Sequence, residues 1–234
     1  MEAPPATPLY RHKAPHRELL RRYRDHFSKR EFRILIVLSL IYFFASVVVS
    51  FYAINYANEV ASNAVTDIIL SNTPAFDVDG LFGYGTILLI AFITLVLLSH
   101  PKRVPFSLFS MGTFFFIRSA FTSLTHLGPF PTVPPNGDWG TLLSHFLFGS
   151  DYFFSGHVGI CFLMALVFWK DEALRYLFIA WSIYMAVIVL LGHYHYSIDV
   201  ASAYFITYTI YVLCVRFFPK SLAIFGSDPI PFTT

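Results

Sequence analysis

The sequence predicts an all-α, polytopic membrane protein: a bundle of six transmembrane helices with both termini in the cytoplasm. Three observations lead to this fold class. Of the 234 residues, 56% are hydrophobic and only 13% are charged. Apolar runs of about 20 residues, the length that crosses about 30 Å of hydrocarbon, recur along the chain. Lys and Arg gather in the segments that such a topology places on one side of the membrane.

The predicted spans follow one another with short connections between several of them. They cover residues 34–56, 81–99, 105–126, 154–169, 174–192 and 198–217. The third span contains a charged residue, Arg118, and the fourth is short unless it begins before Phe153. Because the connections at 100–104 and 170–175 are short, neighbouring spans should pack antiparallel.

The placement of positive charge orients this bundle. Nine of the 16 Lys and Arg lie at or before Arg33. Six more fall in segments that six crossings put on the same side: Lys102, Arg103, Lys170, Arg175, Arg216 and Lys220. By the positive-inside rule this side is cytoplasmic. The one basic residue left over is Arg118.

Two polar motifs open predicted spans on the opposite, extracytoplasmic side. The sequence Asp-Tyr-Phe-Phe-Ser-Gly-His covers 151–157, and His-Tyr-Ser-Ile-Asp-Val covers 195–200. Ionisable groups at membrane depth are costly, which makes them candidates for function. Arg118 lies in the outer part of the third span. The topology therefore predicts that these three elements meet at one end of the bundle.

The second motif can orient a nucleophile. His195 and Asp199 are four residues apart and should share one helix face. A carboxylate there can accept a hydrogen bond from one imidazole nitrogen and leave the other as a nucleophile or a base. His157, which comes from a different span, could protonate a leaving oxygen as a general acid.

The first motif and Arg118 suit an anionic group. Ser155 and Gly156 should lie at the start of the fourth helix, where backbone N–H groups and the helix dipole favour a phosphoryl group. Arg118 adds a planar fork of donors for the same oxygens. A rival interpretation is a zinc or iron site formed by His193 and residues of the two motifs. No compact metal-binding motif supports it, so we predict no metal and no other cofactor.

Cys161 and Cys214 both fall inside predicted spans, so we expect free, apolar packing residues and no disulfide. Three regions follow from these patterns. Residues 1–33 should form a cytoplasmic basic segment, 34–218 the six-helix membrane domain with the catalytic residues, and 219–234 a cytoplasmic tail. Within the first, the sequence from Arg17 to Arg33 indicates a basic helix. It is either an interfacial helix on an anionic leaflet or a flank that orients the first span.

The two histidine motifs together resemble those of the type 2 phosphatidic acid phosphatase superfamily. Within it, residues 149–157 and 195–200 are most similar to the sphingomyelin synthase branch. Arg118, followed by Thr122 and Thr125, resembles the Arg-and-Thr motif in the third span of that branch. The resemblance covers roughly residues 60–215.

The resemblance implies a two-step transfer through a phosphohistidine. His195, oriented by Asp199, would attack the phosphorus of a phospholipid headgroup while His157 protonates the departing lipid hydroxyl. A lipid alcohol or water would then attack the phosphohistidine. The resemblance further implies substrate contacts by Arg118, Asp151, Ser155, Gly156, Tyr196 and Thr125.

The scarcity of positive charge favours one substrate class. Phosphatases of this superfamily hold a doubly charged monoester with extra Lys and Arg, whereas here Gly192, His193 and Tyr194 stand where an Arg would precede the last His. We therefore expect a phosphodiester, with phosphocholine or phosphoethanolamine transferred to a lipid alcohol or hydrolysed. A lipid phosphate phosphatase is the second interpretation, and a non-catalytic lipid-binding bundle is the third.

The expected partners are a membrane phospholipid and a lipid alcohol or water as acceptor, with no nucleic acid. Association of several copies of the chain is left open. The predicted outer loops contain no Asn-x-Ser/Thr site. This observation and the short chain favour a bacterial inner membrane, with the active site on the extracytoplasmic face.

Overall fold

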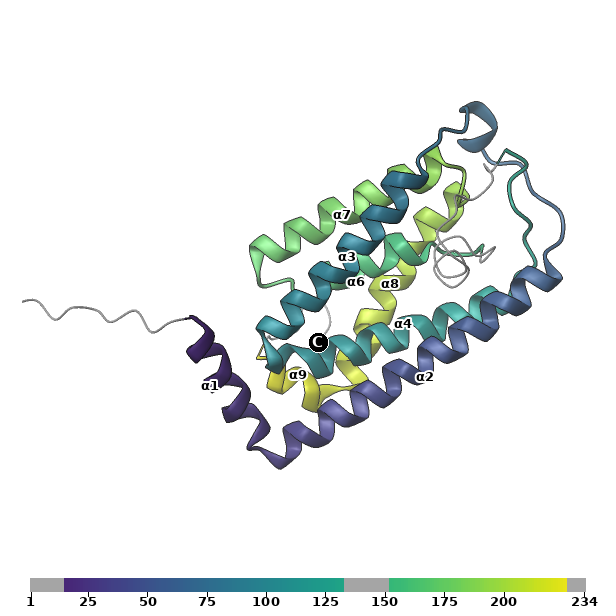
Figure 1. The fold of residues 1–234 in the computed structure, drawn as a ribbon. Coiled ribbons are helices and arrows are strands. Elements are labelled where there is room, and N and C mark those ends of the chain that lie inside the picture. The colour runs from purple at the N-terminus through teal and green to yellow at the C-terminus, as the bar shows by residue number, and fades with distance from the viewer. Residues whose placement is uncertain (1–14, 133–151, 227–234) are drawn as a thin grey trace, which may run out of the picture.

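The computed structural model describes residues 15–132 and 152–226, and every regular element in these ranges is helical (Figure 1). The predicted all-α fold class is therefore confirmed. The helices are α1 (Pro15–Phe27), α2 (Arg30–Val60), α3 (Asp79–Ser99), α4 (Val104–Leu124), α6 (Gly156–Val167), α7 (Glu172–Leu191), α8 (Ser197–Phe217) and α9 (Pro219–Phe225). Two short 3-10 helices are η1 (Leu70–Asn72) and η2 (Pro101–Arg103).

Five of these helices are long and apolar enough to cross a membrane: α2, α3, α4 with the preceding η2 turn, α7 and α8. The chain therefore has the helices of an integral, multi-pass membrane protein. The fourth predicted span, 154–169, corresponds to α6, which has only 12 residues. At a rise of 1.5 Å per residue it is about 18 Å long, too short to cross the hydrocarbon core alone.

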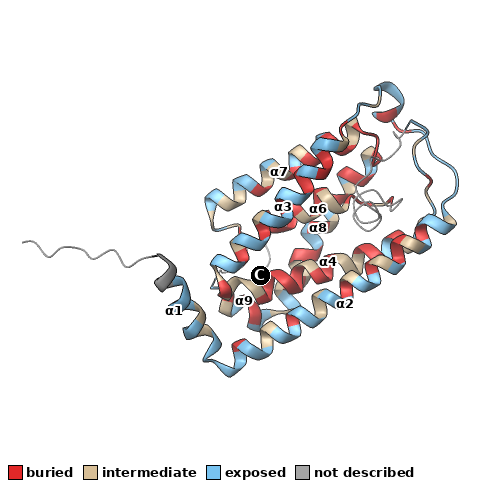
Figure 2. Ribbon diagram, in the orientation of Figure 1, coloured by how far each residue is buried: buried red, intermediate tan, exposed pale blue. Residues whose placement is uncertain are grey.

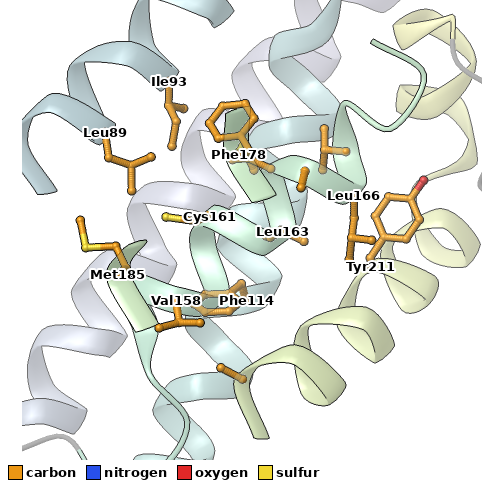
Figure 3. Packing of buried hydrophobic residues seen from close by; sticks show 14 of the residues in the cluster. Leu89, Ile93, Phe114, Val158, Cys161, Leu163, Leu166, Phe178, Met185 and Tyr211 are labelled. Atoms are coloured by element: carbon orange, nitrogen blue, oxygen red, sulfur yellow. The ribbon is translucent and has the colours of Figure 1, made fainter. Parts of the chain in front are cut away.

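Non-helical backbone precedes the short helix α6, and this backbone is buried in protein. The side chains of Phe154 and Ser155, just before the helix, are 0% exposed. Along α6, Val158, Cys161 and Leu163 are also fully buried among the neighbouring helices (Figure 3). Irregular backbone at membrane depth is tolerated where protein rather than lipid surrounds it. As expected, Cys161 and the equally buried Cys214 are free thiols.

Helix α2 shows the opposite pattern. It runs beside α4 along most of its length (Figure 1) and exposes large apolar side chains on its other face, including Ile41, Phe44 and Tyr52 (Figure 2). The α2 positions buried in the bundle include small residues, among them Ser39 and Ser46. Small residues let membrane helices approach closely, and a lipid environment accounts for an apolar outer face.

The bundle has two ends of different character. The basic end holds α1, η2, α9 and the α6–α7 connection, and Lys102, Arg103 and Lys170 line a common pocket there. The opposite end, which we call the site end, holds four segments: 61–78, 125–132, 152–155 and 192–196. Figure 1 shows the site end on the right and α1 on the left. The basic residues of several connections thus lie together, away from both histidine motifs.

Candidate active site

The start of α8 holds a buried histidine–carboxylate pair. His195 Nδ1 lies 3.3 Å from Asp199 Oδ2, which is long for a hydrogen bond, and the two residues are 5% and 0% exposed. The same Oδ2 accepts a hydrogen bond from the Tyr196 backbone N–H at 3.1 Å. Because a carboxylate only accepts, this contact puts the ring proton on Nδ1 and leaves a lone pair on Nε2. Such a pair can orient the imidazole as a nucleophile or as a base.

The start of α6 is joined directly to this pair. Ser155 is the N-cap residue of α6, and its Oγ accepts from the Val158 N–H at 3.5 Å. The Ser155 backbone N–H donates to the backbone oxygen of Asp199 at 3.0 Å. The two histidine motifs, far apart in the sequence, are thus hydrogen-bonded to each other.

His157, the second residue of α6, is half-buried beside an aromatic side chain of α3. Its ring centroid lies 4.5 Å from that of Phe82. The Phe82 ring also lies 5.0 Å from the ring of Tyr194, the residue before His195. His157 and the segment that carries His195 therefore contact the same phenyl ring.

Arg118 of α4 reaches the start of α6. The residue is 5% exposed, and its Nε donates to the Phe154 backbone oxygen at 3.2 Å. A Cβ added to Gly156 would lie only 2.9 Å from Arg118 Nε. The glycine thus allows the close approach of the guanidinium to the first turn of α6. This cation and the positive end of the α6 dipole together suit a phosphoryl oxygen.

The backbone before Ser155 is strained. Phe153 and Phe154 have φ angles of 124° and 36°, a region that non-glycine residues rarely adopt. Helix α4 holds this turn on both sides: Thr125 Oγ1 donates to the Tyr152 backbone oxygen at 3.0 Å, and Arg118 binds the Phe154 oxygen. Strain of this kind persists where surrounding contacts fix it, and it is concentrated at functional sites.

Tyr196 connects the start of α8 to two loops of the site end. It is 1% exposed, and its hydroxyl donates to the Gly128 backbone oxygen at 2.9 Å and receives the Val65 N–H at 3.3 Å. Its ring packs with Leu70 and Tyr152 in a small buried cluster. The structure therefore gives the hydroxyl of this predicted substrate-contact residue two backbone partners from other loops.

Most of the residues predicted for the site lie in one connected group. Hydrogen bonds or close approaches link those on α4 to the start of α6, and those at the start of α6 to α8: Arg118, Thr125, Ser155, Gly156, His195 and Asp199. His157 is part of the same first turn of α6. Asp151 lies outside the described residues.

The sequence did not indicate the role of Asp67, a residue of the loop between α2 and α3. Its carboxylate binds Ser197 at the start of α8, 130 residues away. Burial alone would raise the pKa of this carboxyl, but hydrogen bonds from Leu70 and Ser197 outweigh it and hold the pKa below its usual range. An Asp that caps the turn after it is a local signal. No local pattern reveals its distant partner.

His193 forms a second connection between segments of the site end. It is 1% exposed with φ of 57°, and its two ring nitrogens contact the hydroxyls of Thr132 and Thr73. Burial lowers its pKa, which favours the neutral ring. His193 is one of the residues of the rival metal-site interpretation. Within residues 15–132 and 152–226, no three His, Cys, Asp or Glu side chains are grouped to hold a metal.

Fold and site together define a multi-pass helical bundle with a buried His–Asp pair, a second histidine and one arginine at one end. Residues 149–216 match the family model described as PAP2 superfamily C-terminal, which spans both histidine motifs. The match supports the predicted superfamily for this part of the chain, and lipid phosphatase or phosphotransferase chemistry with it. No curated protein and no solved structure matches the chain.

Proposed function

We propose that this protein is a sphingomyelin synthase-like phosphotransferase that acts on phospholipid headgroups through a phosphohistidine. It would transfer phosphocholine or phosphoethanolamine to a lipid alcohol, or hydrolyse the headgroup when water is the acceptor. The observation that supports this proposal is the buried contact between His195 Nδ1 and Asp199, which leaves Nε2 as a nucleophile beside the start of α6.

In the first step, His195 Nε2 attacks the phosphorus of the headgroup. A P–N bond forms, and the bond from phosphorus to the diacylglycerol oxygen breaks. His157 gives its proton to that oxygen, so that a neutral alcohol leaves. Asp199 stabilises the imidazole ring as it becomes positive. Arg118 and the first turn of α6 stabilise the charge that develops on the phosphoryl oxygens.

In the second step, an acceptor hydroxyl attacks the phosphohistidine. His157, now neutral, takes the proton of the acceptor, and a new P–O bond forms as the P–N bond breaks. The electron pair of that bond returns to His195 Nε2, and the enzyme is regenerated. A lipid alcohol as acceptor gives transfer, and water gives hydrolysis.

The charge of the site supports a phosphodiester substrate. Arg118 is the only Lys or Arg between Val104 and Trp169, and the described segments of the site end contain no other. A phosphate monoester carries a charge of about −1.5 to −2 at pH 7. A phosphodiester headgroup carries a single negative charge on phosphorus, which one guanidinium balances.

The positions of the two ends support an orientation. We infer that the basic end lies in the cytoplasm, since Lys and Arg are enriched in cytoplasmic loops. The site end then faces the extracytoplasmic side, in a bacterial inner membrane. The substrate would be a phospholipid of the outer leaflet of that membrane.

The test is to identify the products of purified protein in bilayers that contain phosphatidylcholine, phosphatidylethanolamine, phosphatidic acid, ceramide and diacylglycerol. Mass spectrometry should show that a headgroup has moved to a lipid alcohol, or a free phosphorylated headgroup, and the His195→Ala protein should show neither. Inorganic phosphate from phosphatidic acid would instead establish the second candidate, a lipid phosphate phosphatase, which the superfamily match supports. Specific lipid retention without turnover would favour a binding bundle.

A further inference from the structure

Asp67 uses both carboxylate oxygens, each toward a different part of the molecule. Oδ1 accepts from the backbone N–H groups of Ile69 and Leu70 at 2.8 and 3.0 Å. Oδ2 accepts from the backbone N–H and the hydroxyl of Ser197 at 2.7 and 2.8 Å. The residue is 8% exposed. Four hydrogen bonds to one buried carboxylate form a strong, directional link between the α2–α3 loop and α8.

The partner of this carboxylate lies inside the histidine motif. Ser197 is the first residue of α8 and stands between His195 and Asp199. The first N–H groups of a helix have no partner within the helix, and a side chain usually satisfies them locally. Here Asp199 accepts the N–H of Tyr196, and Asp67 accepts the N–H of Ser197. The carboxylates of Asp199 and Asp67 therefore hold the backbone that directly follows His195.

The loop end of the link is itself held firmly. The Oδ1 bonds hold the backbone at the start of η1, and Leu70 in η1 is 2% exposed and packs with Tyr152 and Tyr196. Asp67 therefore connects α8 to a packed element of the loop. On the other side of His195, His193 contacts Thr73 and Thr132. The nucleophile thus lies between two connections to the loops.

We propose that Asp67 is a positioning residue for His195 that acts through Ser197. This inference rests on the proposed role of His195 as the nucleophile. Asp67 fixes the first turn of α8, so that Nε2 points at the phosphorus while Nδ1 keeps its contact with Asp199. A displacement of about 1 Å at a reacting atom can cost about 100-fold in rate.

The decisive variant is Asp67→Asn. An asparagine of the same shape has one acceptor oxygen, and its NH₂ group would face N–H donors on the other side. We expect kcat per active site to fall about 10- to 100-fold, with KM changed less than about twofold. The same range is seen in metalloproteins when a residue that orients a metal-binding side chain is replaced. Active sites are counted by trapped phosphohistidine, so that loss of folded protein does not count as loss of rate.

Asp77→Asn is the matched control. Asp77 belongs to the same loop and is exposed, and its carboxylate receives a weak local hydrogen bond of 3.4 Å from the Asp79 N–H. It loses the same charge without breaking the link to α8. The control should keep the kcat and KM of the unmodified protein. A loss equal to that of Asp67→Asn would show a general charge effect and overturn the proposal.

Ser197→Ala tests the link from its other side, and it serves if Asp67→Asn does not fold. It removes one of the four bonds and should lower kcat per active site about threefold, or about 0.65 kcal/mol. Because both substitutions act on one contact, the double variant should lose less than the sum of the two free energies. Unchanged kcat per active site in either single variant, even with a lower melting temperature, would overturn the proposal.

The ¹⁵N chemical shifts of the His195 ring separate this inference from the proposed function. In the unmodified protein Nδ1 should carry the proton, and Asp67→Asn should mix the two tautomers. If no lipid is turned over but this shift changes, the proposed function fails, while the effect of Asp67 on the orientation of the His195 ring is established. If lipids are turned over and neither kcat nor the tautomer responds to Asp67→Asn, the positioning role fails alone.

Discussion

The two ends of the bundle use charged side chains in different ways. At the site end, Asp67, Arg118 and Asp199 are at most 8% exposed. The side chains of Asp67 and Arg118 bind segments distant in the sequence, and the Asp199 carboxylate binds His195 and the Tyr196 N–H within its own motif. At the basic end, the ion pair between Arg103 and Asp171 spans 3.2 Å with side chains that are 18% and 34% exposed. The charged side chains are thus buried and hydrogen-bonded at the site end, and partly exposed to solvent at the basic end.

This difference in burial predicts which substitutions should change activity and which should change only stability. Burying a charge costs several kcal/mol, so such groups persist where hydrogen bonds and function retain them. Partly exposed pairs contribute about 0–1 kcal/mol. Substitutions of the buried charged residues at the site end should therefore change the rate per folded molecule. Substitutions at the basic end should change stability alone.

The largest effect is expected for His195→Ala. Removing the nucleophile should lower kcat by about 10⁴-fold or more, as in other enzymes that lose a catalytic nucleophile. Radiolabelled headgroup phosphate should then no longer be trapped on the protein. His126→Ala is the control, since His126 is an exposed residue of the site end. Turnover retained in His195→Ala would sink the phosphohistidine mechanism.

Arg118→Lys should have the next largest effect. The lysine keeps the charge but replaces a planar fork with a point charge, and it cannot reproduce the Nε contact with the Phe154 oxygen. We expect a loss of about 100-fold in kcat, comparable to removing one donor to a developing oxyanion. Steady-state kinetics in bilayers measure it. Near-normal kinetics would exclude Arg118 as the phosphate ligand.

Gly156→Ala should have a smaller effect on the same interaction. The added Cβ would lie 2.9 Å from Arg118 Nε, so the guanidinium must shift by a few tenths of an ångström. We expect kcat to fall about 10-fold, because a small misplacement costs part of the orientation effect. Gly80→Ala is the matched control, since a Cβ there meets nothing within 4 Å. Equal losses in both variants would contradict this reading.

The same contrast between the two ends explains how far the sequence could predict the structure. Apolar run length predicted the all-α class and the places of the long helices, because both depend on local composition. The spacing of His195 and Asp199 predicted their contact for the same reason. The fourth span was predicted at 154–169, whereas α6 covers 156–167, because Phe154 and Ser155 lie buried in the turn before the helix and do not extend it.

The contacts that the sequence could not predict join distant segments. Asp67 and Ser197 are 130 residues apart, and nothing near either one marks the other. The Tyr196 hydroxyl bonds to the backbone of two loops, at Gly128 and Val65. Such pairs form only once the helices have packed, so their information lies in the tertiary arrangement and not in any local pattern.

The smallest effect on activity is expected at the basic end, for Arg103→Met. Arg103 pairs with Asp171, and its guanidinium lies 5.2 Å from the centroid of the Phe168 ring. Losing these contacts should cost about 1–2 kcal/mol of stability and lower the melting temperature. The kcat should stay unchanged, because no contact of this residue reaches the histidine motifs.

The control for this prediction is Arg216→Met, which removes the same charge from an exposed position near the end of α8. It should leave both the melting temperature and kcat close to those of the unmodified protein. A loss of kcat per active site in Arg103→Met, with Arg216→Met unaffected, would show that the basic end is coupled to the chemistry. The proposed distinction, activity at the site end and stability at the basic end, would then be wrong, because a change at η2 would be transmitted along α4 to Arg118.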